Sequence, residues 1–477
     1  MKATDNDILQ KIDKYIEEHR EQMIRDLSGL VRVPSVQLAA EKDAPFGKEC
    51  RRILEETKEL YENHGIETVI SPDNKYAVSY FNEGDKTIGL FSHGDVVPAD
   101  GKWEIGDPFD PIIKDGYLFG RGCNDDKSGI IQSLYAAKMI RELDLPFNSR
   151  LMIVTGSNEE TGMADILSFV ENEKIPDVSL VLDGEYPYYG GEKSSLKFDI
   201  ISKTEFKTIK SITGGKVYNI VLGEVKAELE FSNSLYTEIT EICEGDAALE
   251  TEKTGNLITV TAKGKSAHTA NVDESRNALV LLADMLIKCN SIPQNERDIL
   301  GEISSFIGSG HGIGLGIEHI DKDFGQLICS NGLIRTEGEK LVVGFDIRAG
   351  ISFDTEDIKA NILKATNANW EVRFNRISKG YLIDNNLTCA KKISEVYAEI
   401  TGDTEKKPRL TSGGTYARAL SNAYSIGTVD YKLAKPINLP EGHGGVHQPD
   451  EKISIEGFLG ALKILVCLLL ELDNIKG

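Results

Sequence analysis

The sequence lacks the features of a secreted or membrane-spanning protein. Its seven cysteines are scattered, odd in number and form no C-x-x-C pair, which argues against a disulfide framework or a thiolate zinc site. The longest apolar run, 458–470, is interrupted by Lys463 and is shorter than the ~18–20 residues that cross a bilayer. No basic segment followed by an apolar one opens the chain, so no secretory signal is predicted. We therefore expect a cytoplasmic protein with reduced thiols.

Basic residues are outnumbered by acidic ones. The chain has 54 Lys and Arg and 76 Asp and Glu, which gives a formal net charge of −22. A surface of this sign repels nucleic-acid phosphates and anionic lipid headgroups, so we expect neither nucleic acid nor a membrane as partner. The hydrophobic share of 40% is ample for a folded core. A length of 477 residues predicts about three domain-sized units, most simply arranged as two unequal domains.

Strands alternate with helices over the first part of the chain. This order is typical of an α/β fold in which a mostly parallel sheet is sandwiched by helices. The predicted helices are 6–33, 45–65, 128–143 and 164–173, and the predicted strands are 66–70, 77–81, 87–92, 150–155 and 178–182.

The pattern changes at about residue 193. Two blocks rich in Val, Ile and Thr follow, 196–288 with strands at 216–229 and 257–265, and 315–365 with a strand at 341–347. Helices at 389–401 and 454–472 then resume the first pattern. We expect an α+β lid domain at 193–384, inserted into a catalytic domain that comprises 1–192 and 385–477.

Possible metal ligands follow three of the predicted strands and precede one helix. In an open α/β sheet, ligands bind in the crevice beyond the carboxyl ends of the strands. One imidazole and at least three carboxylates should therefore meet there. Mixed nitrogen and oxygen donors favour zinc, manganese or cobalt over calcium and magnesium, which prefer oxygen alone. The candidate side chains are His93, Asp95, Asp125, Asp126, Glu159, Glu160 and Asp183.

Two pairs among these candidates indicate more than metal binding. Asp95 stands two residues after His93, where its carboxylate can hold the second nitrogen of a ligating imidazole. Glu159 and Glu160 are adjacent, so one of them can bind a metal while the other acts as a base.

The segments around these candidates resemble a known family. Residues 92–98 read SHGDVVP, 120–127 read GRGCNDDK and 157–162 read SNEETG. Together with GKSAH at 264–268 and HQPDE at 447–451, they resemble the dinuclear zinc peptidase family of aminoacylases, succinyl-diaminopimelate desuccinylases and carboxypeptidase G. Within that family the chain is most similar to the PepV-type dipeptidases. The resemblance extends over nearly the whole chain and implies a zinc-exopeptidase-like fold.

The resemblance implies a site with two divalent metal ions, expected to be zinc, with manganese or cobalt as alternatives. His93 and Asp183 would bind one ion, Glu160 and His447 the other, and Asp125 would bridge both. The peptide bond after the bridging aspartate is cis in this family. Two ions ~3.5–4 Å apart can share a hydroxide and polarise a scissile carbonyl.

The resemblance also implies roles in catalysis and substrate binding. Asp95 would orient His93, and Glu159 would be the general base. His268, in the inserted domain, would stabilise the oxyanion. The implied substrate-binding residues are Asn219, Arg348 and Gly414.

The substrate expected from this set is a dipeptide or short peptide with free termini, because the Arg348 guanidinium can bind a free α-carboxylate through two hydrogen bonds. Two other functions stay open: a deacylase of N-acyl amino acids, which would use the same metal chemistry, and a silent relative that binds peptides or metal. His443, four residues before His447, stays open as an alternative ligand.

The inserted domain also bears on the oligomeric state. Relatives that dimerise carry a shorter lid and take the oxyanion histidine from a partner subunit. The two-block insertion resembles the PepV arrangement, in which the second block takes the partner's place. The resemblance therefore implies a functional monomer.

Overall fold

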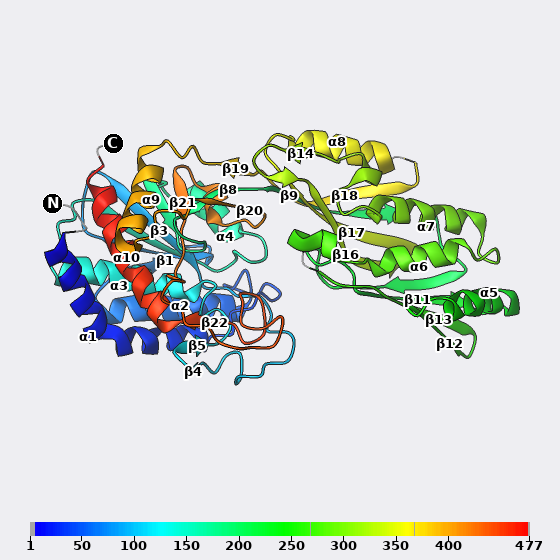
Figure 1. Ribbon diagram of the computed structural model, residues 1–477, viewed down its shortest axis with the longest axis horizontal. Helices are drawn as coiled ribbons and strands as arrows, with labels where there is room; N and C mark the ends of the chain where they lie inside the picture. Colours follow the sequence, from blue (N-terminus) through cyan, green and yellow to red (C-terminus); the bar gives the residue numbers. More distant parts are fainter. Residues whose placement is uncertain (1–4, 268, 367, 476–477) are drawn as a thin grey trace. The chain divides into compact units, whose positions relative to one another are not determined.

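The computed structural model describes residues 5–267, 269–366 and 368–475 (Figure 1). The chain forms two compact units. Unit 1 comprises Met1–Gly190, Ile383–Arg409 and Gly414–Gly477, and unit 2 comprises Gly191–Leu382 and Leu410–Gly413.

Unit 1 is built on a six-stranded sheet whose centre is parallel. The strands β6, β3, β7 and β21 pair in parallel, while β1 and β2 add an antiparallel edge. The prediction of a largely parallel sheet is confirmed, although the sequence did not indicate the short edge strand β21. The order is β1 (Thr68–Ile70), β2 (Tyr76–Phe81), β6 (Arg150–Gly156), β3 (Thr87–His93), β7 (Val178–Val181) and β21 (Ala423–Ser425).

Helices cover both faces of this sheet, as predicted. Successive side chains of a strand point to opposite faces. In β3, Leu90 belongs to the core that α3 (Lys127–Glu142) and α10 (Ile455–Asp473) share. Its neighbour Phe91 packs edge-on against Phe169 of α4 (Ala164–Asn172), with the ring centroids 5.3 Å apart. The remaining helices of unit 1 are α1 (Asn6–Val31), α2 (Lys48–Asn63) and α9 (Thr388–Thr401), and α1 lies beside α3 and α10 (Figure 1).

Unit 2 contains two antiparallel four-stranded sheets. Strands β11 and β13 alternate buried and exposed residues, as expected for sheets with one face covered. The first sheet has the order β10 (Ile209–Thr213), β11 (Glu224–Glu230), β13 (Leu257–Lys263) and β12 (Leu249–Thr254), with α5 (Asn233–Glu244) and α6 (Ala278–Ile287). The second has the order β16 (Ile328–Glu337), β17 (Lys340–Ala349), β9 (Ser194–Ser202) and β18 (Trp370–Ser378), with α7 (Gln294–Ile307) and α8 (Thr355–Thr366).

The strand predicted over 216–229 is shorter in the structure, because β11 begins only at Glu224. The preceding residues fold over Gly332 in β16, where a Cβ atom would collide with the carbonyl oxygen of Val217. The close approach of these two backbone segments prevents the predicted strand from starting at 216.

The shorter elements complete the structure. None of the helices in the described ranges combines the length and the apolar character that spanning a membrane requires. The short strands form a sheet of β4 (Ile112–Lys114), β5 (Tyr117–Phe119) and β22 (Lys452–Ser454), a sheet of β8 (Tyr189–Glu192), β19 (Tyr381–Leu382) and β20 (Arg409–Thr411), and a pair of β14 (Ile320–Asp321) and β15 (Gly325–Gln326). The 3₁₀ helices are η1 (Thr269–Glu274), η2 (Ile313–Leu315) and η3 (Tyr416–Ala419).

Candidate metal centre

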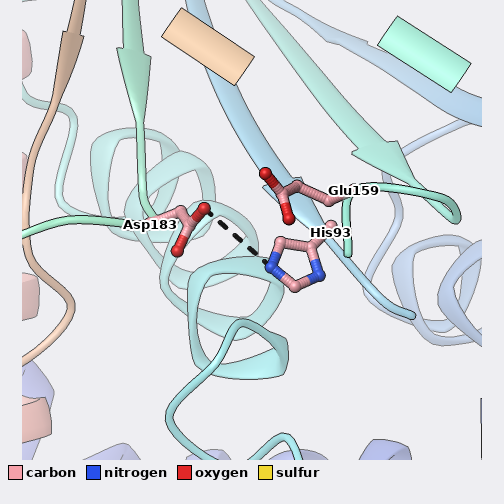
Figure 2. A group of neighbouring side chains, drawn as sticks. All are labelled: His93, Glu159 and Asp183. Carbon is pink, nitrogen blue, oxygen red and sulfur yellow. Dashed lines mark ion pairs between the residues drawn. The ribbon is translucent and has the colours of Figure 1, made fainter. Parts of the chain in front are cut away.

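The predicted metal ligands gather at the carboxyl edge of the parallel strands in unit 1. His93 is the last residue of β3 and pairs in register with Gly156, the last residue of β6. Asp183 follows β7, and Glu159 follows β6. Figure 2 shows the side chains of His93, Glu159 and Asp183 converging on one place. The sheet thus brings together residues that are far apart in the sequence.

Asp125 lies between two imidazoles and presents one carboxylate oxygen to each. Its Oδ1 lies 3.0 Å from Nε2 of His93, and its Oδ2 lies 3.1 Å from Nε2 of His447. The same nitrogen of His447 lies 3.1 Å from Glu160 Oε1, and Nε2 of His93 lies 4.0 Å from Asp183 Oδ2 (Figure 2). The structure therefore divides the predicted ligands into two sets that share Asp125. The Asp125–Asp126 peptide bond is cis, as the resemblance implies.

These distances fit divalent metal ions. Ligand atoms ~2.0–2.2 Å from a zinc ion lie about 3–4 Å from one another. The structure contains two groups of three candidate ligands. Within each group the ligand atoms lie within 4.8 Å of one another, and both groups include His93. One group adds Glu159 and Asp183, and the other adds Asp125 and Glu160. Glu159 therefore lies close enough to His93 and Asp183 to belong to the same group of candidate ligands.

The electrostatics of the site also favour cations. Burial raises the pKa of the Asp183 carboxyl well above its usual value, and the nearby charge of Asp125 adds to this effect. Burial likewise raises the pKa of Glu159 far above that of an ordinary glutamate. Burial also acts on Asp125, but hydrogen bonds from His447 and His93 outweigh it and lower the pKa of that carboxyl. Buried carboxylates at this density need compensating positive charge, which divalent ions would supply.

Glu159 brings a buried carboxylate to this group of candidate ligands. Its side chain is buried, and Oε1 has no hydrogen-bond partner among the residues that the structure describes. An unpaired oxygen in a buried site is costly unless a ligand or water meets it. Oε1 of Glu159 is therefore placed to meet a bound ligand or water.

Asp95 contacts more of the site than the sequence indicated. Nδ1 of His93 lies 2.9 Å from the backbone oxygen of Asp95 and 3.5 Å from its carboxylate. The carboxylate itself accepts the backbone N–H groups of Glu159 and Glu160, at 3.0 and 3.1 Å. Asp95 thus holds the glutamate pair as well as the imidazole.

Glu451 has a similar role that the sequence did not reveal. Its carboxylate accepts backbone N–H groups from Gly122, Asn124 and Asp125, at 3.1 to 3.2 Å. It also pairs with Arg121 at 2.6 Å, and both side chains are buried. The only signal in the sequence was its place in the HQPDE segment.

The two histidines near the C-terminus have different partners. His447 faces Asp125 and Glu160, whereas Nδ1 of His443 lies 2.5 Å from Asp450 Oδ2. The other oxygen of Asp450 accepts the backbone N–H groups of Glu104 and Ile105, at 2.9 and 2.8 Å. In this geometry His443 supports a loop and His447 faces the metal ligands.

The predicted substrate-binding residues lie in both units. In unit 2, Arg348 donates to the buried Asp346 through Nε and Nη2 and to the Ser412 carbonyl through Nη1, at 2.9 to 3.1 Å. Asn219, also in unit 2, accepts the Thr269 N–H at its backbone oxygen. Gly414, the third of them, lies in unit 1 just before η3. His268, which was expected to stabilise the oxyanion, lies outside the described residues.

The chain is similar to known peptidases over most of its length. Residues 89–471 match peptidase family M20/M25/M40. "Putative dipeptidase YtjP" of Bacillus subtilis is 27% identical over 474 residues, covering 95% of this chain and 97% of that protein. A "Putative dipeptidase" of Staphylococcus epidermidis is 25% identical over 465 residues, covering 94% and 96%.

Solved structures show the same fold. The di-peptidase Dug1p from Saccharomyces cerevisiae aligns with a TM-score of 0.62 at 14% identity, covering 98% of this chain and 99% of that chain. Human carnosine dipeptidase 1 aligns with a TM-score of 0.59 at 13% identity, covering 98% and 100%. The match to the family covers most of the chain and includes the ligand-bearing ends of β3, β6 and β7, so the protein belongs to peptidase family M20/M25/M40.

Proposed function

We propose that the protein hydrolyses dipeptides and short peptides with free termini at a site with two divalent metal ions. The observation that carries this proposal is the position of Asp125, which turns one carboxylate oxygen toward each of two separate ligand sets. His93 and Asp183 would hold one ion, and Glu160 and His447 the other. Relatives named as dipeptidases, aligned over nearly their whole length, support the choice of substrate.

The chain's own residues then have distinct tasks. When bound, the two ions would polarise the scissile carbonyl and acidify a water molecule. Glu159 Oε1 takes the proton of the attacking water and returns it to the leaving amine. Asp95 holds the backbone of Glu159 in place, as its hydrogen bonds indicate. We assign stabilisation of the oxyanion to His268 and binding of the substrate carboxylate to Arg348.

The proposal includes zinc as the metal and the cytoplasm as the location. A mixture of imidazole and carboxylate ligands suits zinc, with manganese and cobalt as alternatives. All seven cysteines are free thiols in the structure, which is consistent with a reducing compartment.

The test is an assay of the purified protein on a panel of unblocked dipeptides. The protein is first stripped of metal with a chelator and then supplied with Zn²⁺ or Mn²⁺. We expect activity only with added metal, and a loss of about 10²–10⁴-fold in kcat in the Glu159→Gln variant. The exposed Glu18 provides the matched control, because Glu18→Gln should leave kcat unchanged.

Three outcomes would contradict the proposal. Full activity of Glu159→Gln would remove the assigned base. Hydrolysis of N-acyl amino acids without hydrolysis of dipeptides would identify a deacylase. Metal binding with no hydrolysis of either class would identify a silent relative.

A further inference from the structure

The segment that carries Glu159 and Glu160 is held by two buried carboxylates. Three consecutive backbone N–H groups donate to them. Those of Glu159 and Glu160 reach Asp95, and that of Asn158 reaches Asp165 Oδ2 at 2.6 Å. Both aspartates are almost fully buried. Asp95 thus holds the backbone of the glutamate pair itself, and Asp165 holds the residue just before it.

Asp165 is in turn held by a tyrosine from a distant part of the chain. The hydroxyl of Tyr416, in η3, donates to the same Oδ2 atom of Asp165 that accepts the Asn158 N–H. The Tyr416 side chain is 1% exposed. Its ring also meets the His93 ring edge-on, with centroids 6.4 Å apart and an angle of 78°. Tyr416 thus contacts both the predicted ligand His93 and the carboxylate that holds the segment before Glu159.

A glycine makes room for this pair. At Gly156, the last residue of β6, a Cβ atom would collide with both the Tyr416 hydroxyl and Asp165 Oδ2. No side chain therefore fits at position 156 while the tyrosine and the aspartate keep their contact. The contact between Tyr416 and Asp165 therefore requires a glycine at the end of β6.

We infer that Tyr416 is a positioning residue for the metal centre. Its hydroxyl fixes the Asp165 carboxylate, which fixes the backbone that presents Glu159 and Glu160. A phenylalanine at position 416 would fill the same space but would remove the side-chain hydrogen bond that the Tyr416 hydroxyl gives to Asp165 Oδ2. Among the described residues, that carboxylate would then be held only by the backbone N–H groups of Asn158 and Ile166. This inference rests on the proposed function for its effect on turnover, but its effect on metal binding does not require that function.

The test compares Tyr416→Phe with a chemically matched control. Tyr15 is 3% exposed, and its hydroxyl donates to the Glu142 carboxylate at 2.8 Å, between α1 and α3. Tyr15→Phe therefore removes the same kind of hydrogen bond away from the ligand segments. For both variants and the wild type we would measure kcat and KM on an unblocked dipeptide, Zn²⁺ affinity of the apo-protein by chelator competition, and Tm.

We expect Tyr416→Phe to lower kcat about 10–100-fold and to weaken the binding of one Zn²⁺ by a similar factor, as loss of outer contacts to metal ligands typically does. KM should stay within about twofold because the substrate contacts are not changed. Tyr15→Phe should lower Tm without changing kcat or Zn²⁺ affinity. If Tyr416→Phe does not fold, Asp165→Asn, which keeps the shape but replaces one of the two accepting oxygens by an NH2 group, should show the same losses.

Unchanged kcat and Zn²⁺ affinity in the folded Tyr416→Phe variant would overturn the inference. A wild-type protein without dipeptide hydrolysis would instead overturn the proposed function, and the Zn²⁺ affinities would still decide the role of Tyr416. Equal losses in Tyr15→Phe and Tyr416→Phe would reduce the effect to general stability and would also overturn the inference.

Discussion

His443 and His447 are four residues apart, and only their contacts distinguish them. His447 turns its Nε2 toward Asp125 and Glu160, while His443 binds Asp450. Spacing alone left both open as ligands, because the intervening glycine-containing loop can present either imidazole. The partners of His447, Asp125 and Glu160, come from segments more than two hundred residues earlier, whereas Asp450, the partner of His443, lies only seven residues later. The sequence around the two histidines therefore does not show which of them faces the candidate ligands.

We expect His447→Ala to weaken the binding of one Zn²⁺ by more than about 100-fold, because it removes a ligand rather than an outer contact. His443→Ala should leave Zn²⁺ binding unchanged but lower Tm, because Asp450 is fully buried and would lose a charge-assisted hydrogen bond. Metal content by atomic spectroscopy and Tm by calorimetry would measure the two effects. The reverse pattern would assign the metal to His443.

Arg348 is the residue on which the choice of substrate depends. Asp346 holds its guanidinium through two nitrogens, so the group is oriented before any ligand arrives. Charge-assisted hydrogen bonds are worth about 1.5–3 kcal/mol, so we expect Arg348→Ala to raise KM for unblocked dipeptides about 10–150-fold. The measurement is KM for a dipeptide and for its C-terminal amide, which should differ in the wild type and converge in the variant.

The control for this prediction is Arg335→Ala on β16, beside β17, which carries Arg348. Arg335 pairs with the exposed Glu337, so its removal should not change KM. An unchanged KM in Arg348→Ala would refute the role of this residue and leave the proposed hydrolysis intact.

At the scale of elements, the loop before α3 has no regular structure and depends on a single carboxylate. Glu451 accepts three of the loop's backbone N–H groups and pairs with Arg121. Removing one partner of a buried pair leaves an uncompensated charge and costs about 3–5 kcal/mol. We therefore expect Arg121→Met to destabilise unit 1 by that amount and to displace the loop that presents Asp125.

The two tryptophans allow the stability of unit 1 to be measured separately. Trp103 lies in unit 1 and Trp370 in unit 2, so fluorescence of a Trp370→Phe background follows the urea unfolding of unit 1 alone. Arg121→Met with Glu451→Gln should recover part of the lost stability, because the buried charge is then absent. If the single variant unfolds at the same urea concentration as its parent, the pair does not support the loop.

Regular elements could be predicted where their pattern is long. The helix expected at 128–143 is Lys127–Glu142, and the strand expected at 87–92 is Thr87–His93. β21 has only three residues, too few for any periodicity to show. The strand expected from 216 fails because Gly332, more than a hundred residues later, brings another backbone segment against it.

The candidate ligands could be predicted for a related reason. His93 and Asp183 lie at or just after the ends of buried strands, and the end of a parallel strand has a fixed place in the fold. The hydrogen bonds that Asp95, Asp165 and Glu451 accept could not be predicted from the sequence. Each of these carboxylates binds backbone N–H groups of a loop. Loop backbones carry no side-chain signal, so these supports become visible only in three dimensions.

At the scale of the whole molecule, the construction of unit 2 is the reason why we expect a monomer. It contains two sheets, each with its own helices, and a single buried core includes side chains from both. The resemblance implies that a two-block domain replaces the partner that other relatives require. The formal charge of −22 also opposes self-association. On these grounds we propose that the protein acts as a monomer.

We therefore expect sedimentation equilibrium to give the mass of one chain, 52.5 kDa, and kcat per chain to be constant on dilution. Mixing two inactive variants tests the oligomeric state through the activity that returns. If a partner supplied His268, mixed dimers of His268→Ala and Glu159→Gln would each contain one intact site and restore about a quarter of wild-type activity. In a monomer every chain in the mixture keeps its own defect, so no activity returns. Restored activity, or activity lost on dilution together with a mass of two chains, would show that the second block does not replace a partner.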